Sequence, residues 1–302
     1  MIIPFLKLIV ERFRDDPEAP PALYIGDSVL GKVSSTDTDT ENLGMLVRAS
    51  LGTRCVVISM PSYTPVHMAN YARLLKRLPR RPKLVIVPFN IRCLSPQWFD
   101  NPKYQQRDHL DAIHRFLENP SGPVPNVPVE NIESEDVGAF RHFRATKVSS
   151  PFTAAVSVAE LEDCRDNPAN DANSAIKRTS DLLAYHYGLD LPPSHPCLNA
   201  LTDLCWELST IGVRVLVYAT PINVVLGGTR LGEAFLATIR DRITAARDAT
   251  SAGGVSTFED FHAICPSTEF LHPDYVVEHL NQYGRHRLTR RIVDRAKRLL
   301  DD

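Results

Sequence analysis

The sequence lacks a long hydrophobic run. The apolar stretch at the N-terminus, residues 1–10, is short and contains Lys7. A helix needs about 20 mostly apolar residues to cross a bilayer, so this stretch cannot span one. It has neither a charged region before it nor a small-residue cleavage site after it, which argues against a signal peptide. We therefore expect an N-terminal helix that packs on the domain, and no association with a membrane.

The sequence also lacks paired cysteines. Its six cysteines are scattered and form no Cys-x-x-Cys pair: Cys55, Cys93, Cys164, Cys197, Cys205 and Cys265. This spacing argues against a zinc site and against a disulfide framework. We expect a cytoplasmic protein without a metal or other cofactor. Cys55 and Cys93 lie in or beside predicted strands, where we expect small buried hydrophobic side chains.

Net charge is low as well. The chain has 34 Lys and Arg against 36 Asp and Glu, a formal charge of −2 at pH 7, so no overall field favours nucleic acid. A basic run from Arg285 to Arg298 stands near the C-terminus. Because an apolar stripe runs through the same segment, we interpret the run as the solvated face of a helix and not as a nucleic-acid surface.

What the sequence does contain is an alternation of short apolar runs and helical patterns. Five runs have the length and β-branched content of buried parallel strands: Ala22–Gly26, Cys55–Met60, Leu84–Phe89, Val213–Ala219 and Val255–Phe258. Helical spacing of apolar residues is found at 66–78, 198–210, 231–249 and 282–300, with Asn281 as an N-cap. This alternation predicts an α/β fold with helices on both faces of a parallel sheet, in the strand order 2-1-3-4-5.

One stretch interrupts the alternation. Between Leu94 and Pro196 we find no convincing strand, but a Pro-rich loop at 119–128 and helical patterns at 104–117 and 173–187. We interpret residues 94–196 as a helical insertion in a single domain that covers residues 1–302. An insertion after the third strand lies above the carboxyl ends of the strands, where it could form a lid or a substrate pocket. A structural embellishment, or a contact with another copy or a partner subunit, is an equally good interpretation.

Three polar motifs stand where predicted strands end or where the last helix begins. Gly26-Asp27-Ser28 follows the first strand, Asn90 follows the third, and His279 precedes the C-terminal helix. A serine at such a turn can act as a nucleophile, an Asn amide can donate to an oxyanion, and a histidine can act as a base. Each motif alone is as well explained by an ordinary turn or a structural side chain.

A sequence that partly matches a phosphate-binding loop overlaps the first motif. Residues 26–32 match Gly-x-x-x-x-Gly-Lys, but Val33 stands where such a loop needs Ser or Thr to hold magnesium. We therefore expect no nucleotide.

In combination, the motifs resemble those of the SGNH (GDSL-like) hydrolases. They are Gly26-Asp-Ser28, Asn90 and His279-Leu-Asn-x-x-Gly, and they cover about the first 100 and the last 90 residues. Residues 90–98 and 217–223 also look like SGNH-type proteins of bacterial glycan and secondary-metabolite pathways.

The resemblance implies a flavodoxin-like α/β/α fold with a five-stranded parallel sheet. It implies Ser28 as nucleophile and His279 as general base, with an oxyanion hole built from the Ser28 amide, a second-loop amide and Asn90. We further expect Asp27, Arg92 and Trp98 to bind substrate.

The sequence departs from the family pattern at three places. The second block offers Ser62 where the family has a glycine amide, and Pro88 replaces the glycine two residues before Asn90. The acid normally stands three residues before the histidine, where this chain has Val276. Asp274 is the preferred acid and Glu278 the alternative.

A rival base is His272, with Glu269 three residues before it. It lacks the Leu-Asn-x-x-Gly that follows His279, so we prefer His279.

These residues favour a serine esterase or O-acyltransferase that acts on an ester of a small molecule or sugar. Two alternatives remain open. The site could be repurposed as a lyase or cyclase that expels a sulfate- or phosphate-type leaving group, or the chain could be an inactive binding or scaffold subunit with a misplaced His279.

Overall fold

A five-stranded parallel sheet forms the centre of the protein. The structure is a computed structural model that describes residues 4–124, 147–150, 152–157, 172–192 and 194–301. The strands are β1 (Ala22–Gly26), β2 (Cys55–Ser59), β3 (Leu84–Phe89), β6 (Arg214–Ala219) and β7 (Ser256–Asp260). Their order is β2-β1-β3-β6-β7 and every pairing is parallel, which confirms the predicted order. It is the order of flavodoxin-like sheets, which bind ligands where the strand order reverses.

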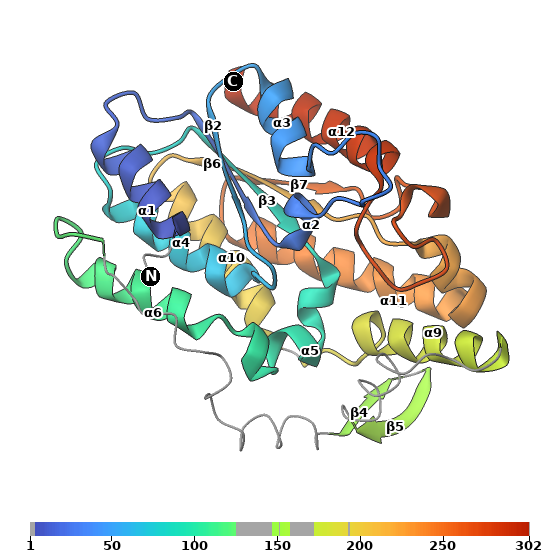
Figure 1. Cartoon of the computed structure of the whole chain (residues 1–302). Coiled ribbons are helices and arrows are strands. Elements are labelled where there is room, and N and C mark those ends of the chain that lie inside the picture. Colours follow the sequence, from blue (N-terminus) through green and yellow to red (C-terminus); the bar gives the residue numbers. More distant parts are fainter. Residues whose placement is uncertain (1–3, 125–146, 151, 158–171, 193, 302) are drawn as a thin grey trace.

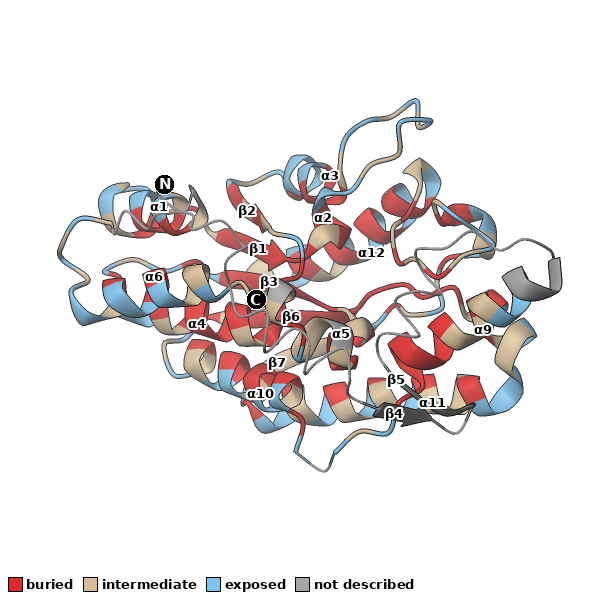
Figure 2. Ribbon diagram, turned by 60° about the horizontal axis from the view of Figure 1, so that its bottom comes forward, coloured by how far each residue is buried: buried red, intermediate tan, exposed pale blue. Residues whose placement is uncertain are grey.

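Helices cover both faces of the sheet (Figure 1). On one face lie α1 (Pro4–Val10), α4 (Pro65–Arg77), α10 (Pro196–Ser209) and α11 (Val224–Ala252). On the other lie α2 (Ser28–Gly31), α3 (Leu43–Leu51) and α12 (Gln282–Asp301). Each layer has its own apolar core, and the buried residues of the helices face the sheet (Figure 2). The central strands β1 and β3 are buried throughout because both of their faces are covered.

The short elements complete the two layers. The predicted N-terminal helix is confirmed as α1, which continues into a π-helical turn, η1 (Glu11–Asp15), and buries Phe13 with it. A 3-10 turn, η5 (Ser267–Glu269), lies between β7 and α12. Helix α11 begins earlier than predicted, because it consists of two helices joined by a kink at Gly232, where φ is 73°. Within the described ranges no helix combines the length and hydrophobicity that a membrane span needs.

The segment predicted as a helical insertion is only partly helical. It contains η2 (Ile91–Leu94), α5 (Pro96–Phe99), η3 (Pro102–Tyr104), α6 (Arg107–Glu118) and α9 (Ala172–Tyr187). It also contains an antiparallel hairpin, β4 (Lys147–Ser150) and β5 (Thr153–Ser157), so the expectation of no strand here was wrong. Among the described residues, β4 and β5 pair with each other and not with the main sheet. Each has four or five residues and no continuous apolar run, so neither shows the sequence pattern of a buried strand. Most of the Pro-rich loop lies outside the described residues.

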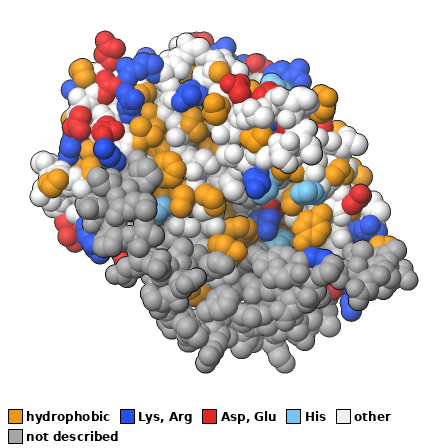
Figure 3. Space-filling view, in the orientation of Figure 1, with side chains coloured by type: hydrophobic (Ala, Val, Ile, Leu, Met, Phe, Trp, Pro, Cys, Tyr) orange, Lys and Arg blue, Asp and Glu red, His pale blue; other side chains and the backbone are white. Residues whose placement is uncertain are grey.

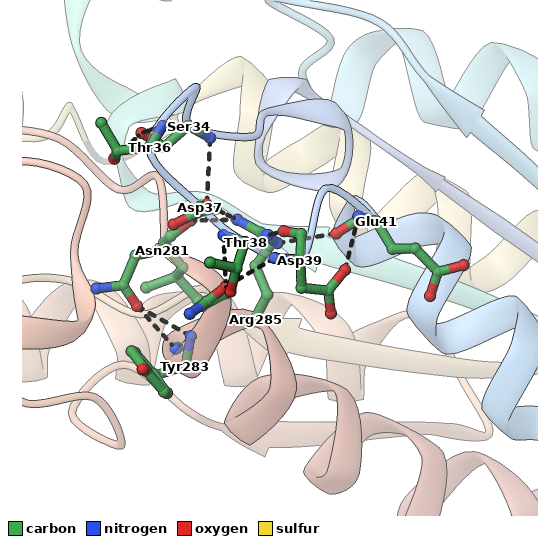
Figure 4. A network of polar contacts seen from close by, with 12 residues as sticks. Ser34, Thr36, Asp37, Thr38, Asp39, Glu41, Asn281, Tyr283 and Arg285 are labelled. Atoms are coloured by element: carbon green, nitrogen blue, oxygen red, sulfur yellow. Dashed lines mark hydrogen bonds and ion pairs between the residues drawn. The ribbon is translucent and has the colours of Figure 1, made fainter.

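The basic run on α12 is largely solvated, as predicted, but Arg285 is buried and corrects that interpretation. Its guanidinium pairs with Asp37 at 2.6 Å and donates to the carbonyls of Asp39, Glu41 and Leu280. These contacts tie the loop that follows α2 to the start of α12 (Figure 4). On the face shown in Figure 3, basic and acidic side chains of the described residues are interspersed, in keeping with the low net charge.

Candidate active site

Ser28 stands at the carboxyl end of the central strand β1. Asp27 caps the short helix α2, accepting a hydrogen bond from the Val29 backbone N–H at 3.0 Å, and Ser28 is the first residue of that helix. Gly26 allows this turn to lie close to β3, because a Cβ there would come within 2.4 Å of the Pro88 ring. Gly26 and Pro88 therefore pack closely together.

His279 meets Ser28 from the other end of the chain. Its Nε2 lies 3.1 Å from Ser28 Oγ, within hydrogen-bond distance. His279 belongs to an extended segment before α12, in which Phe270 and Leu280 form an antiparallel bridge and Leu271 N–H donates to the His279 carbonyl at 2.9 Å. The structure thus brings together the two residues that sequence analysis assigned as nucleophile and base.

Burial lowers the pKa of His279, since desolvation disfavours the imidazolium. The negative charge of Glu278 raises this pKa, while Arg92, Lys32 and His272 lower it. The net pKa lies below the ordinary value, so the ring is neutral near pH 7 and Nε2 can accept a proton.

The buried Asp27 and the half-buried Asn90 form a hydrogen-bonded pair. Asn90 Nδ2 donates to Asp27 Oδ2 at 2.9 Å, and Asn90 Oδ1 accepts from the Arg92 backbone N–H. An amide group has two N–H donors, so this bond orients Asn90 and leaves its second hydrogen for another acceptor. Burial raises the pKa of Asp27 to about 6, although the bonds from Asn90 and Val29 lower it.

Ser62 occupies the loop after β2, where sequence analysis expected an oxyanion donor. It is buried, lines the same pocket as Ser28, and has a φ of 69°, in the left-handed region that favours glycine. The loop thus has at Ser62 a backbone conformation that is more usual for glycine. Whether its N–H faces an oxyanion depends on a ligand, and this role stays a prediction.

Arg92 and Trp98 also line the pocket. The Arg92 guanidinium is 5.0 Å from the Trp98 ring centre and donates from Nη1 to Glu278 Oε2 at 2.7 Å. The charge of Arg92 is therefore already paired. Both residues line the pocket, as does Asp27, but their predicted role in binding substrate stays a prediction.

The candidate acids differ sharply in environment. Asp274 is exposed, and the structure does not bring it to the imidazole: within the described residues the His279 side chain has one hydrogen bond, to Ser28. The preceding carbonyl, of Pro273, is held by Asn223 at 2.8 Å. Glu278 is 1% exposed and paired with Arg92. The choice of Asp274 as acid stays a prediction.

The rival base is placed away from this contact. His272 is exposed, and its predicted companion Glu269 pairs instead with Arg287 at 2.6 Å.

The pocket has a volume of about 230 Å³ and opens at the carboxyl edge of the sheet. Sequence analysis missed part of its wall, namely Tyr63, Thr64, Cys93, His186, Tyr275 and Val277. His186 comes from α9, so the inserted segment contributes to the pocket. The expected position of residues 94–196 above the strand ends indicated that this segment could line the pocket. The sequence did not single out His186, because Tyr-His-Tyr in a helix looks like part of an ordinary core.

Among the described residues there is no group of three or more His, Cys, Asp and Glu side chains suited to hold a metal ion. The overlapping Gly-x-x-x-x-Gly-Lys sequence does not form a loop, because Ser28–Gly31 are themselves helical.

Comparison with known proteins gives only weak likenesses. No family model matches the chain, and no curated protein matches it. Among solved structures it is similar to a putative acylhydrolase from Bacteroides fragilis, with 10% identity and a TM-score of 0.43 over 97% of this chain and 95% of that one. A catalytic mutant of an acetylxylan esterase from Geobacillus stearothermophilus gives 12% and 0.40 over 92% and 93%. A carbohydrate acetylesterase from Sinorhizobium meliloti gives 13% and 0.37 over 92% and 98%. Function is therefore inferred from the geometry of the site itself.

Proposed function

We propose that the protein is a serine esterase that cleaves an acyl ester of a small molecule or a sugar. The observation that carries the proposal is the contact of 3.1 Å between Ser28 Oγ and His279 Nε2 at the wall of a pocket. A serine with a neutral histidine in this position is the nucleophile–base arrangement of acyl transfer. The misplaced histidine that would mark an inactive scaffold member is not observed.

In this reaction Ser28 Oγ attacks the ester carbonyl while its proton passes to His279 Nε2. The oxyanion accepts hydrogen bonds from the Ser28 and Ser62 N–H groups and from the second hydrogen of the Asn90 amide. The alkoxide then leaves with the proton from Nε2. A water molecule, deprotonated by Nε2, attacks the acyl-enzyme and releases the carboxylic acid, which restores Ser28. A pocket of about 230 Å³ is smaller than most ligand pockets, which favours a small acyl group.

The test is labelling with a serine-directed fluorophosphonate, followed by mass spectrometry of the labelled peptide. We expect one label, on Ser28, which disappears in Ser28→Ala and is strongly slowed in His279→Ala. His272→Ala is the matched control, because His272 lies in the same loop but is exposed, and it should label at the normal rate. Absence of labelling in the wild type, or loss in His272→Ala with normal labelling in His279→Ala, contradicts the assignment.

The fate of the acyl group needs a second measurement. With p-nitrophenyl acetate as donor, release of acetate indicates hydrolysis, whereas acetylation of an added sugar or glycerol indicates transfer to an acceptor hydroxyl. We expect acetate as the main product.

A further inference from the structure

Among the residues that the structure describes, no carboxylate bonds the far nitrogen of His279, and another feature can orient the ring. The position three residues earlier is Val276, which is buried and lines the pocket. Asp274 is exposed. The anionic side chain next to His279 in sequence is Glu278, and its carboxylate is almost completely buried.

Two donors from different elements hold this carboxylate. Arg92, in η2 after β3, donates to Oε2 at 2.7 Å, and the Tyr187 hydroxyl donates to Oε1. Tyr187 is the last residue of α9, in the inserted segment. Its ring packs edge-on against Phe235 of α11, with ring centres 6.1 Å apart. A buried carboxylate needs such partners, so the position of Glu278 is closely determined.

Fixing Glu278 also fixes the direction of His279. Leu280 bridges Phe270 and the His279 carbonyl accepts from the Leu271 N–H, as in an antiparallel strand pair, and neighbouring side chains of a strand point to opposite sides. With Glu278 turned toward Arg92 and Tyr187, the next side chain turns toward Ser28. The same carboxylate acts on the imidazole through its charge, against Arg92, Lys32 and His272.

We propose that Tyr187 and Arg92 are positioning residues that hold Glu278 so that His279 faces Ser28, and that helix α9 thereby forms part of the active site. The inference rests on the proposed serine esterase function and deepens it. It assigns residues of the segment 94–196 a role in the reaction, because the Tyr187 hydroxyl would help to orient His279 through Glu278 without contacting substrate.

The first variant is Tyr187→Phe in the full chain, which keeps the ring against Phe235 and removes the hydroxyl alone. A hydrogen bond to a charged group is lost, so we expect labelling of Ser28 and kcat to fall by about tenfold. KM for p-nitrophenyl acetate should change by less than about twofold, because no contact with substrate is removed.

Tyr185→Phe is the matched control. Tyr185 lies on the same helix and is equally buried, but the two carboxylate oxygens of Glu278 are bonded to Arg92 and Tyr187. We expect normal rates in this variant. Wild-type rates in Tyr187→Phe, or an equal loss in both variants, would overturn the proposal.

Glu278→Gln provides a second test that remains valid if Tyr187→Phe does not fold. The carboxylate of Glu278 raises the pKa of His279. Its removal should therefore shift the acid limb of the labelling profile, the range in which the labelling rate falls as the pH is lowered, to lower pH. An unchanged acid limb overturns the proposal.

Failure of the proposed function is recognised separately. A folded wild type that takes no label refutes the esterase, and the imidazole of His279 is then titrated by NMR in the wild type and in Glu278→Gln. A lower titration midpoint in the variant supports the link between Glu278 and His279, and equal midpoints overturn it.

Discussion

At the scale of single residues, Asp27 shows how a buried carboxyl couples the site to pH. Burial raises its pKa to about 6, against an ordinary value of 3.8, despite hydrogen bonds from Asn90 and Val29. Between these values the folded protein still binds the proton that the unfolded chain has released. The stability that Asp27 confers is therefore greatest below the lower value and falls as the pH rises through the upper one.

We expect this loss to be visible against the neutral variant Asp27→Asn. Relative to that variant, the unfolding free energy of the wild type should fall by about 2 kcal/mol between about pH 4 and pH 7. Urea unfolding of both proteins at the two pH values measures it, and the comparison cancels the contributions of other titrating groups. A difference between the proteins that does not change with pH would contradict the assignment.

Ser62 is a second position where a single residue can be tested. Its φ of 69° is strained for most side chains but not for glycine, and its proposed role uses only the backbone N–H. We expect Ser62→Gly to keep kcat within about threefold, whereas Ser62→Val, β-branched and disfavoured at positive φ, should lower kcat by at least about tenfold. Steady-state kinetics of the two variants tests this expectation, and circular dichroism checks that both are folded. Equal losses in both would mean that the hydroxyl itself matters.

The sequence predicted single site residues where a motif marks the end of a strand. Ser28 and Asn90 were predicted in this way and His279 from a motif before the last helix, and the structure brings Ser28 and His279 into contact. Tyr187 could not be found, because its role depends on which carboxylate its hydroxyl meets in three dimensions. Val276 stands where the resemblance implies an acid, and the choice of Asp274 over Glu278 in its place stays a prediction.

At the scale of elements, strands were predicted to within two residues because central parallel strands are continuous apolar runs. β1 and β3 have the predicted limits, and β2, β6 and β7 differ from them by one or two residues. Helix limits were less accurate where a kink intervenes, as at Gly232 in α11. The β4–β5 hairpin was missed, since it pairs outside the main sheet.

The link between α12 and the loop after α2 is the element contact most open to test. Arg285 is almost completely buried and joins them through Asp37 and three carbonyls. Lysine cannot reproduce this fork of donors, so we expect Arg285→Lys to lower the unfolding free energy by about 3 kcal/mol. Arg290→Lys, exposed on the same helix, should change it by less than about 0.5 kcal/mol. Urea unfolding measures both, and similar stability of the two variants would contradict the role of Arg285.

At the scale of the whole molecule, the sheet order and the two helical layers followed from the alternation of patterns along the chain. Right-handed crossovers between parallel strands leave few arrangements, so the order 2-1-3-4-5 could be predicted. A pocket wall from residues 94–196 was predicted only as one of two equally good interpretations, because their helices lie on other helices, as α6 on α4 and α9 on α11. Such contacts leave no periodic signal that distinguishes a wall of a pocket from an ordinary core.

The contact between Ser28 and His279 joins residues 251 positions apart. Contacts of such high sequence separation form late, because closing the chain over that length costs entropy before the contact repays it. During synthesis β1, β2 and β3 leave the ribosome long before the segment that carries the base. A growing chain would therefore carry Ser28 as an ordinary, unactivated hydroxyl, and the proposed acyl chemistry would begin only when α12 docks and folding is complete.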